Sequence, residues 1–157
     1  MSQSDFLLLH ELFDGFPSFN RREGLLIVVN ESPARVNDIL KEEAIERTWP
    51  TVALNLELAN ALRDVRPTDR DKAADRFIQS KVRIIQNGPI VLVEIDLLFA
   101  PELYIDPIRL LTNASQLCPL AVAWPGSWDG QTLSYATAAH GHYRHWSRLS
   151  ADIRNVR

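Results

Sequence analysis

Four short hydrophobic runs divide the chain, and segments with helical periodicity separate them. The runs cover residues 25–29, 51–54, 90–95 and 120–124. The first and third runs are hydrophobic at almost every position, which is typical of strands buried on both faces of a sheet. Because these strands alternate with helices, the pattern predicts an α/β fold with a mainly parallel sheet.

The most clearly marked helix follows the first run. Ser32 suits the N-cap, and Pro33 suits the first helical position, where a missing N–H costs nothing. The helix should end before Pro50. Its inward side chains are expected to be Val36, Ile39, Leu40 and Ala44. Further helices are expected near residues 4–14, 55–65, 68–85 and 107–115, the first with Phe6, Leu7, Leu9 and Phe13 on its apolar face.

The pattern changes after residue 124. Asp129 and Gly130 lie between two segments that carry aromatic residues, and Asp-Gly in such a place is the strongest short signal for a β-hairpin. We expect this hairpin to extend the sheet. The hydrophobic pattern then fades into a polar segment with several arginines. We therefore predict one domain over residues 1–146 and a short basic tail over residues 147–157.

Composition narrows the function only a little. The 157 residues are 46% hydrophobic and 24% charged, which suits one globular domain, and the net charge of −3 gives no overall attraction to nucleic acid or anionic membranes. The single cysteine, Cys118, cannot form an internal disulfide and suits a reducing compartment. The N-terminal segment lacks a basic region and an unbroken apolar run. We expect a soluble cytoplasmic protein with no membrane partner.

Residues 25–43 have the strand, loop and helix order of a phosphate-binding loop but not its chemistry. A working loop, G-x-x-x-x-G-K-S/T, supplies backbone N–H groups, an ammonium group and a hydroxyl. The two glycine positions, the lysine position and the hydroxyl position are filled in turn by Asn30, Arg35, Val36 and Asn37. Pro33 also removes a backbone donor, and Glu31 adds negative charge. We expect phosphate to bind poorly.

The run at residues 90–95 ends where phosphate-loop enzymes place their second motif. That motif is an Asp, often followed by Glu, which orient magnesium and polarise water. Here the pair is incomplete in either alignment, because Val93 or Ile95 takes one of the two positions. Glu94 is the best polar candidate, since ligands usually bind at the carboxyl ends of parallel strands. Asp96 is more simply a helix cap.

A series of segments resembles one known family. The segments are LLIVV, TVALNLELANAL, IVLVEIDLLFAPEL, IDPIRLLTNASQ, LAVAWPG and HGHYRHW, spread over residues 20–146. In this order they are similar to the small P-loop protein of type 3 BREX phage-defence systems, the BrxF family. The family's LNLEL piece is matched by residues 55–58, its I-E-L-L-F piece by residues 95–99, and its third piece by residues 123–126. The phosphate loop departs from the family pattern.

The resemblance implies a three-layer P-loop NTPase-like domain with a C-terminal hairpin. The implied strand order places residues 51–54 first, then 90–95, 120–124 and 25–29. It also implies a role in phage defence with other BREX subunits as partners. Since the phosphate loop has lost its defining residues, our leading hypothesis is a non-hydrolytic adaptor or regulator that needs no cofactor. Self-association is a further interaction that we consider.

Two alternative functions stay open at this point. The first is an ATPase with an atypical loop, which would bind ATP and magnesium and use Arg35 and Glu94. The second is a DNA-binding module, because Arg144, Arg148 and Arg154 lie near aromatic residues on which bases could stack. Only a few charges are involved, so we favour a frayed tail with Trp146 packed on the hairpin. DNA would then be reached through partners.

Three histidines near the C-terminus suggest a metal site. They are His140, His142 and His145. A structural zinc site takes four ligands, and Cys118 is the only thiol in the chain. We therefore expect no metal site.

Overall fold

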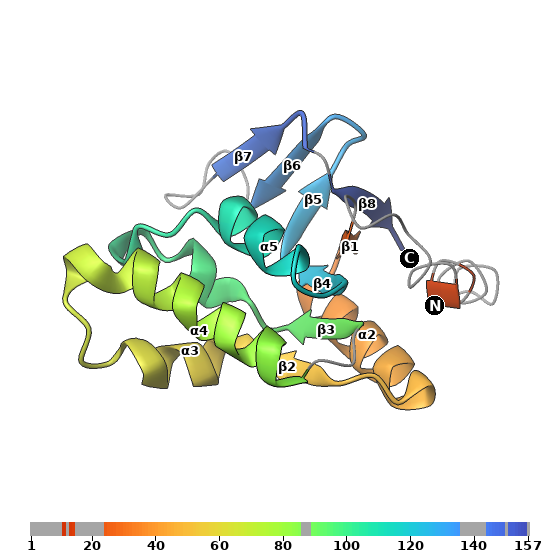
Figure 1. Cartoon of the computed structure of the whole chain (residues 1–157). Helices are drawn as coiled ribbons and strands as arrows, with labels where there is room; N and C mark the ends of the chain where they lie inside the picture. Colours follow the sequence, from red (N-terminus) through yellow and green to blue (C-terminus); the bar gives the residue numbers. More distant parts are fainter. Residues whose placement is uncertain are drawn as a thin grey trace.

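The computed structural model describes residues 11, 13–14, 24–85, 89–135, 144–149 and 151–156 (Figure 1). The first part contains β1 (Leu25–Val29), α2 (Pro33–Arg47), β2 (Thr51–Ala53), α3 (Leu54–Leu62), η3 (Pro67–Asp69) and α4 (Arg70–Ile85). There follow β3 (Ile90–Val93), η4 (Asp96–Phe99), η5 (Pro101–Leu103), α5 (Pro107–Ser115) and β4 (Leu120–Trp124). The last strands are β5 (Gly126–Trp128), β6 (Thr132–Tyr135), β7 (Arg144–Ser147) and β8 (Asp152–Asn155). The elements labelled η are 3-10 helices.

The main sheet has five parallel strands in the order β2-β3-β4-β1-β8. The first four strands confirm the expected order and the expected parallel pairing. β1 lies between β4 and β8, so that Val29 is paired with Trp124 on one side and with Asn155 on the other. A parallel sheet with helices as crossovers is the architecture that the alternating pattern predicts.

Helices cover both faces of this sheet. α2 packs on one face through Val36, Leu40 and Ala44, which are buried as expected. α3, α4 and α5 pack on the other face, so the main part of the molecule has three layers (Figure 1). Alternate residues of β1 belong to the two cores, and all its side chains are buried. Complete burial of each such side chain contributes about 1.5–3 kcal/mol, so this strand anchors the fold.

The C-terminal strand β8 corrects one prediction. Residues 147–157 were expected to form a basic tail, but Asp152–Asn155 pairs in parallel with β1, and Val156 N–H donates to Val29 O at 2.8 Å. Ile153 is the only hydrophobic residue within this strand. An edge strand pairs on one side only and can stay polar on the other, which explains why the hydrophobic pattern did not reveal it.

The hairpin at Asp129 and Gly130 is confirmed, but its place differs from the prediction. β5 and β6 pair around this turn, and Gly130 has a φ of 99°. Instead of extending the main sheet, they form a separate antiparallel sheet with β7. The chain bends sharply after β4, and a Cβ atom at Gly126 would lie 1.8 Å from Ser134 O. Only glycine fits this close approach between β5 and β6, because any Cβ atom there would clash with the backbone of β6.

Aromatic packing holds the small sheet over the end of the main sheet. Tyr135 stacks on Phe99 with ring centroids 4.2 Å apart, and Trp124 meets Phe99 edge to face at 5.0 Å. Trp146 of β7 also contacts both Phe99 and Trp124. Aromatic pairs at such distances add about 0.5–1.5 kcal/mol each beyond the area they bury. The aromatic residues are therefore the hydrophobic core of the C-terminal part.

Little of the predicted N-terminal helix can be compared with the structure. Residues 11, 13 and 14 are helical, Phe13 is buried against Trp49, and the rest of that helix lies outside the described residues.

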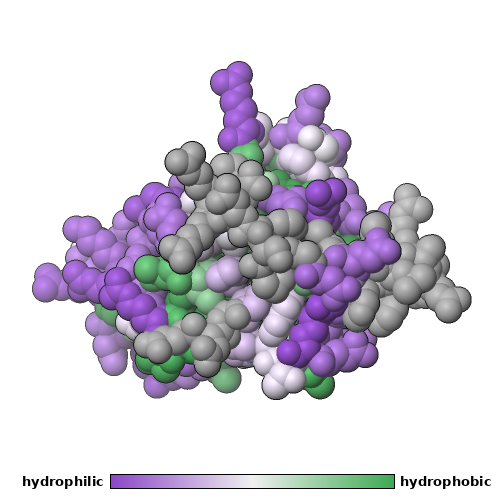
Figure 2. Space-filling model, turned by 45° about the vertical axis from the view of Figure 1, so that its right-hand side comes forward, coloured by the Kyte–Doolittle hydropathy of each residue, from purple (hydrophilic) through white to green (hydrophobic). Residues whose placement is uncertain are grey.

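Cys118 is buried as expected, and burial raises the pKa of its thiol. Within the described part, no helix has the length and apolar character needed to span a bilayer. Outside the atoms drawn in grey, Figure 2 shows a mainly hydrophilic face with hydrophobic surface in small areas.

Candidate functional site

The turn between β1 and α2 lies where a phosphate loop would be, but it is short and internally bonded. Only residues 30–32 separate the strand from the helix. Asn30 is 5% exposed, and its Oδ1 accepts a hydrogen bond from Ser32 N–H at 2.9 Å. Its Nδ2 donates to Val156 O at 2.6 Å. The side chain at the first glycine position therefore closes the turn and attaches β8 to it.

The other three positions of the loop point in different directions. Val36, at the lysine position, is fully buried in the core beneath α2. Asn37 Oδ1 accepts a hydrogen bond from Glu94 N–H at 3.0 Å, so this side chain joins α2 to the end of β3. Arg35 is exposed on α2, and no contact joins its guanidinium to another described residue. These residues do not converge on one ligand position.

Glu94 is held in a strained conformation at the carboxyl end of β3. Its φ is 53°, in the left-handed region, which costs a residue other than glycine about 1–3 kcal/mol. The hydrogen bond to Asn37 Oδ1 holds its N–H, and its carbonyl accepts from Asn55 N–H at 2.9 Å. Its Oε1 lies 3.3 Å from Lys41 Nζ. The carboxylate predicted as the best polar candidate is thus paired with a lysine of α2.

Asn55 completes this polar cluster, and sequence reasoning missed it. Its Oδ1 accepts from Leu97 N–H at 2.8 Å, and its side chain also bonds to Asp96. The signal was an asparagine directly after a short strand, at the start of α3. Asp96 was expected as a cap for the segment after β3, but Ile95 is the N-cap of η4 and Asp96 is its first helical residue. Asn55 fills the capping role from a neighbouring helix.

The charges of this cluster affect one another. Burial raises the pKa of Asp96, the hydrogen bond from Asn55 opposes this shift, and the nearby charge of Glu94 adds to it. Burial also raises the pKa of Tyr135, with a further contribution from Asp96. Tyr135 belongs to β6, so the small sheet closes over this edge of the main sheet. The polar cluster consists of Asn37, Lys41, Asn55, Glu94 and Asp96.

The polar cluster does not fit a nucleoside triphosphate and its magnesium ion. A phosphate loop needs successive free N–H groups and an ammonium group beside them. Here the side chain of Asn30 is hydrogen-bonded to Val156 O within the turn. The lysine of the cluster, Lys41, forms an ion pair with Glu94. Within the described residues, no group of three His, Cys, Asp or Glu side chains could hold a metal ion. What the cluster does is fix the strained end of β3 against α2 and α3.

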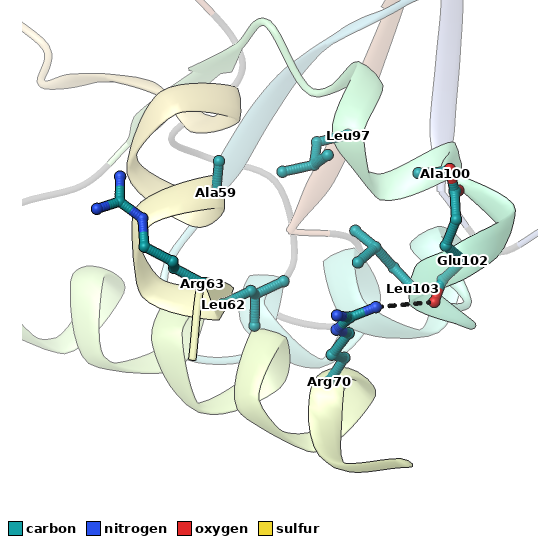
Figure 3. A pocket seen from close by; sticks show the side chains of 8 residues that line it. All are labelled: Ala59, Leu62, Arg63, Arg70, Leu97, Ala100, Glu102 and Leu103. Carbon is teal, nitrogen blue, oxygen red and sulfur yellow. Dashed lines mark hydrogen bonds between the residues drawn. The ribbon is translucent and has the colours of Figure 1, made fainter. Parts of the chain in front are cut away.

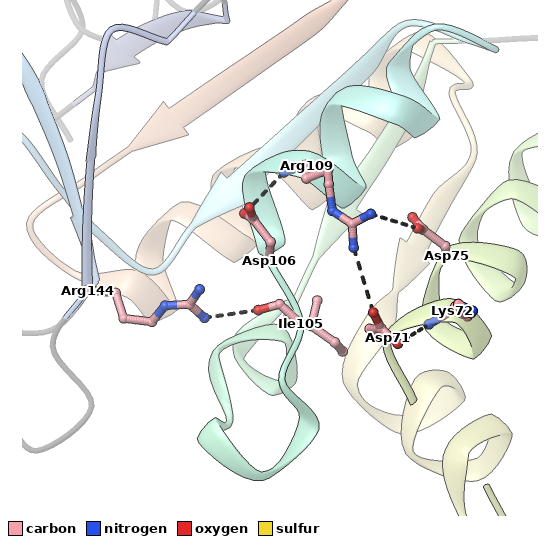
Figure 4. A network of polar contacts seen from close by, with 7 residues as sticks. All are labelled: Asp71, Lys72, Asp75, Ile105, Asp106, Arg109 and Arg144. Atoms are coloured by element: carbon pink, nitrogen blue, oxygen red, sulfur yellow. Dashed lines mark hydrogen bonds and ion pairs between the residues drawn. The ribbon is translucent and has the colours of Figure 1, made fainter. Parts of the chain in front are cut away.

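The C-terminal arginines lie on three different elements. Arg144 of β7 donates from Nη1 to Ile105 O at 3.1 Å and lies 5.1 Å over the ring of Trp146 (Figure 4). Arg154 of β8 pairs with Asp152 at 2.9 Å, while Arg148 is exposed in the connection between these strands. Arg144 therefore attaches the small sheet to the segment before α5. Its guanidinium is already bound within the protein.

Of the three histidines, only His145 falls within the described residues, where it is exposed on β7. His140 and His142 lie outside them.

Comparison of the chain with protein-family models, with curated proteins and with solved structures gave no match.

Proposed function

We propose that the chain is a non-hydrolytic, degenerate P-loop subunit of a BREX-type phage-defence complex. In this role it acts in the cytoplasm as an adaptor or regulator for larger partner proteins. Two features support the proposal: the series of segments that resembles the BrxF family, and a parallel sheet whose first four strands have the order implied by that resemblance. A P-loop NTPase-like origin accounts for a strand, turn and helix that no longer carry phosphate-binding groups.

One observation supports the non-hydrolytic role more than any other. The lysine position holds Val36 within the core, and the first glycine position holds Asn30, whose side chain is bound to Ser32 and Val156. Binding a triphosphate in this turn would require breaking those hydrogen bonds without gaining a cation. The structure of the turn stabilises the fold at the expense of ligand binding.

Thermal denaturation with and without magnesium and ATP tests the proposal. A ligand at about 100 times its dissociation constant adds about 2.7 kcal/mol of stability, so a functional site would raise Tm clearly. We expect no shift. The ATPase alternative instead predicts a shift that disappears in Arg35→Ala and Glu94→Ala. Turnover of ATP by the purified protein would contradict our proposal.

Co-expression with the other subunits of a type 3 BREX system tests the partnership. We expect the chain to elute with at least one larger subunit during size-exclusion chromatography, both with and without nucleotide. Elution as an isolated monomer or self-associated species from all such mixtures would contradict the adaptor role.

The DNA-binding alternative has less support, because Arg144 is bound to Ile105 O and Arg154 to Asp152.

A further inference from the structure

A hollow of about 270 Å³ lies between the end of α3, the start of α4 and the η4–η5 segment (Figure 3). Its apolar lining consists of Ala59, Leu62, Leu97, Ala100 and Leu103. Three charged residues, Arg63, Arg70 and Glu102, complete the lining. Leu97 of η4 lines the hollow, and its N–H donates to Asn55 of the polar cluster, so the hollow lies beside this cluster at the carboxyl end of β3. Ligands of open α/β sheets usually bind at this end.

Arg70 gives the hollow its chemical character. It is half-buried, and it donates from Nε to Val65 O at 3.4 Å. Its Nη1 donates to Glu102 O, also at 3.4 Å (Figure 3). A guanidinium has five N–H donors, so three stay free. No carboxylate pairs with Arg70 within the described residues, whereas the half-buried Arg47 pairs with both Glu43 and Asp14. A partly buried guanidinium without a counter-charge is well suited to bind a carboxylate.

The size of the hollow favours a side chain over a cofactor. Pockets for whole small ligands measure about 300–1,000 Å³, and this hollow is smaller and open. Apolar groups that could widen the contact lie beside it. Leu56 is 73% exposed and shares a face of α3 with Ala59, while Tyr104 is 78% exposed and directly follows Leu103. Exposed tyrosine and arginine residues at a small pocket are typical of a surface that binds another protein, and Leu56 adds apolar area that can be buried there.

We propose that this surface, made of the hollow with Leu56 and Tyr104, binds a segment of a partner protein. The segment inserts one apolar side chain into the hollow and places a neighbouring carboxylate on Arg70. The occupant is thus an acidic, partly hydrophobic peptide segment, and this inference rests on the proposed adaptor function. The charge of Arg70 selects the carboxylate, and the apolar lining selects the side chain beside it.

Selection of random twelve-residue peptides on the immobilised full chain tests this proposal. We expect the recovered sequences to share an aliphatic or aromatic residue next to Asp or Glu. A synthetic peptide of that sequence should bind the wild-type protein, and raised salt should weaken the binding. In Ala59→Glu, a carboxylate enters the hollow, so binding should fall at least tenfold.

Ala61→Glu is the matched control. Ala61 is also exposed on α3 but lies on the opposite side of the helix from Ala59, so the same change there should leave binding unaltered. Both variants should have wild-type circular dichroism and similar Tm values. Recovery of basic peptides, or equal binding by both variants, would overturn the proposal. Peptide binding needs no BREX subunit, so its failure is distinguishable from failure of the co-expression test.

Discussion

The side chain of Asn30 donates a hydrogen bond to the backbone oxygen of Val156, which lies 126 positions further along the chain. The bond is 2.6 Å long and buried. It joins the turn after β1 to the end of β8, at the place where a phosphate loop would have its first glycine. The asparagine at this position is thus part of what stabilises the fold.

Asn30→Ala should destabilise the protein by about 1–3 kcal/mol, because Val156 O and Ser32 N–H lose their buried partner. Urea denaturation monitored by circular dichroism measures the change. Asn155→Ala serves as a control, since Asn155 also joins β8 to its surroundings but through an exposed bond to Trp128 O. This second variant should cost less than about 0.5 kcal/mol. Equal losses would contradict the structural role of Asn30.

Substitutions at Glu94 should reveal its backbone strain. Glu94→Asn and Glu94→Val both remove the ion pair with Lys41, but asparagine tolerates a positive φ and valine does not. We therefore expect Glu94→Val to be less stable than Glu94→Asn by about 1–3 kcal/mol in chemical denaturation. If the two variants unfold at the same denaturant concentration, Glu94 does not have the positive φ described above.

Asp96→Asn should stabilise the protein at neutral pH. The pKa of Asp96 in the folded state is raised by burial and by Glu94, with the bond from Asn55 opposing the shift. An acid with a raised folded-state pKa favours folding when protonated, and stability falls as pH rises from the unfolded pKa of 3.8 through the folded one. The gain in the free energy of unfolding should be below about 1 kcal/mol at pH 7.

Denaturation of both proteins between about pH 3 and pH 7 provides the measurement, because this range runs from below the pKa of a free Asp to neutrality. The advantage of Asp96→Asn should shrink as the pH falls below the folded-state pKa of Asp96. The pKa of the Tyr135 phenol should also decrease in this variant, because one of the two causes that raise it is removed. An advantage that grows in acid would show that the sign of the Asp96 shift is wrong.

The buried ion pair on α2 should contribute more to the free energy of unfolding than a longer, more exposed pair of the same type. Arg47 Nε lies 2.7 Å from Glu43 Oε1, and the side chains are 15% and 3% exposed. Arg47→Ala would leave the Glu43 carboxylate buried with less compensation and would remove the guanidinium from the ring of Trp49, at a cost of about 3 kcal/mol. Arg109→Ala should cost less, about 0.5 kcal/mol, since its contacts with Asp71 and Asp75 are long, at 4.0 and 3.9 Å, and its own side chain is 53% exposed (Figure 4). Thermal denaturation of the two variants compares them directly.

The centre of the fold follows from the hydrophobic pattern, while its margins do not. The runs at β1, β3 and β4 are hydrophobic on both faces, so they could be placed from the sequence alone. β8 could not, because its residues are mostly polar and it is recognisable as a strand only once β1 is beside it. The direction in which the hairpin leaves β4 depends on contacts among aromatic residues that are distant in sequence.

The candidate site shows the same division. The lack of phosphate-loop residues was visible in the sequence, and the helical hydrophobic pattern correctly predicted that Val36 faces inward. The use of Asn30 as a tie to Val156 and the positive φ of Glu94 depend on the neighbouring strands and helices. Asn55 bonds to the segment after β3 only because α3 and η4 are adjacent in space.

The position of β8 also affects how the chain acquires its structure during synthesis. β1 is synthesised early and is wholly hydrophobic. β8, which covers its outer edge, is synthesised after every other described strand and ends at Asn155. Until β8 is synthesised, the outer edge of β1 has unpaired backbone N–H and C=O groups through which nascent chains can pair with one another. Chaperone dependence and low yield at high expression rates are the practical results to expect, and a lower rate of expression, which keeps unfinished chains dilute, should relieve both.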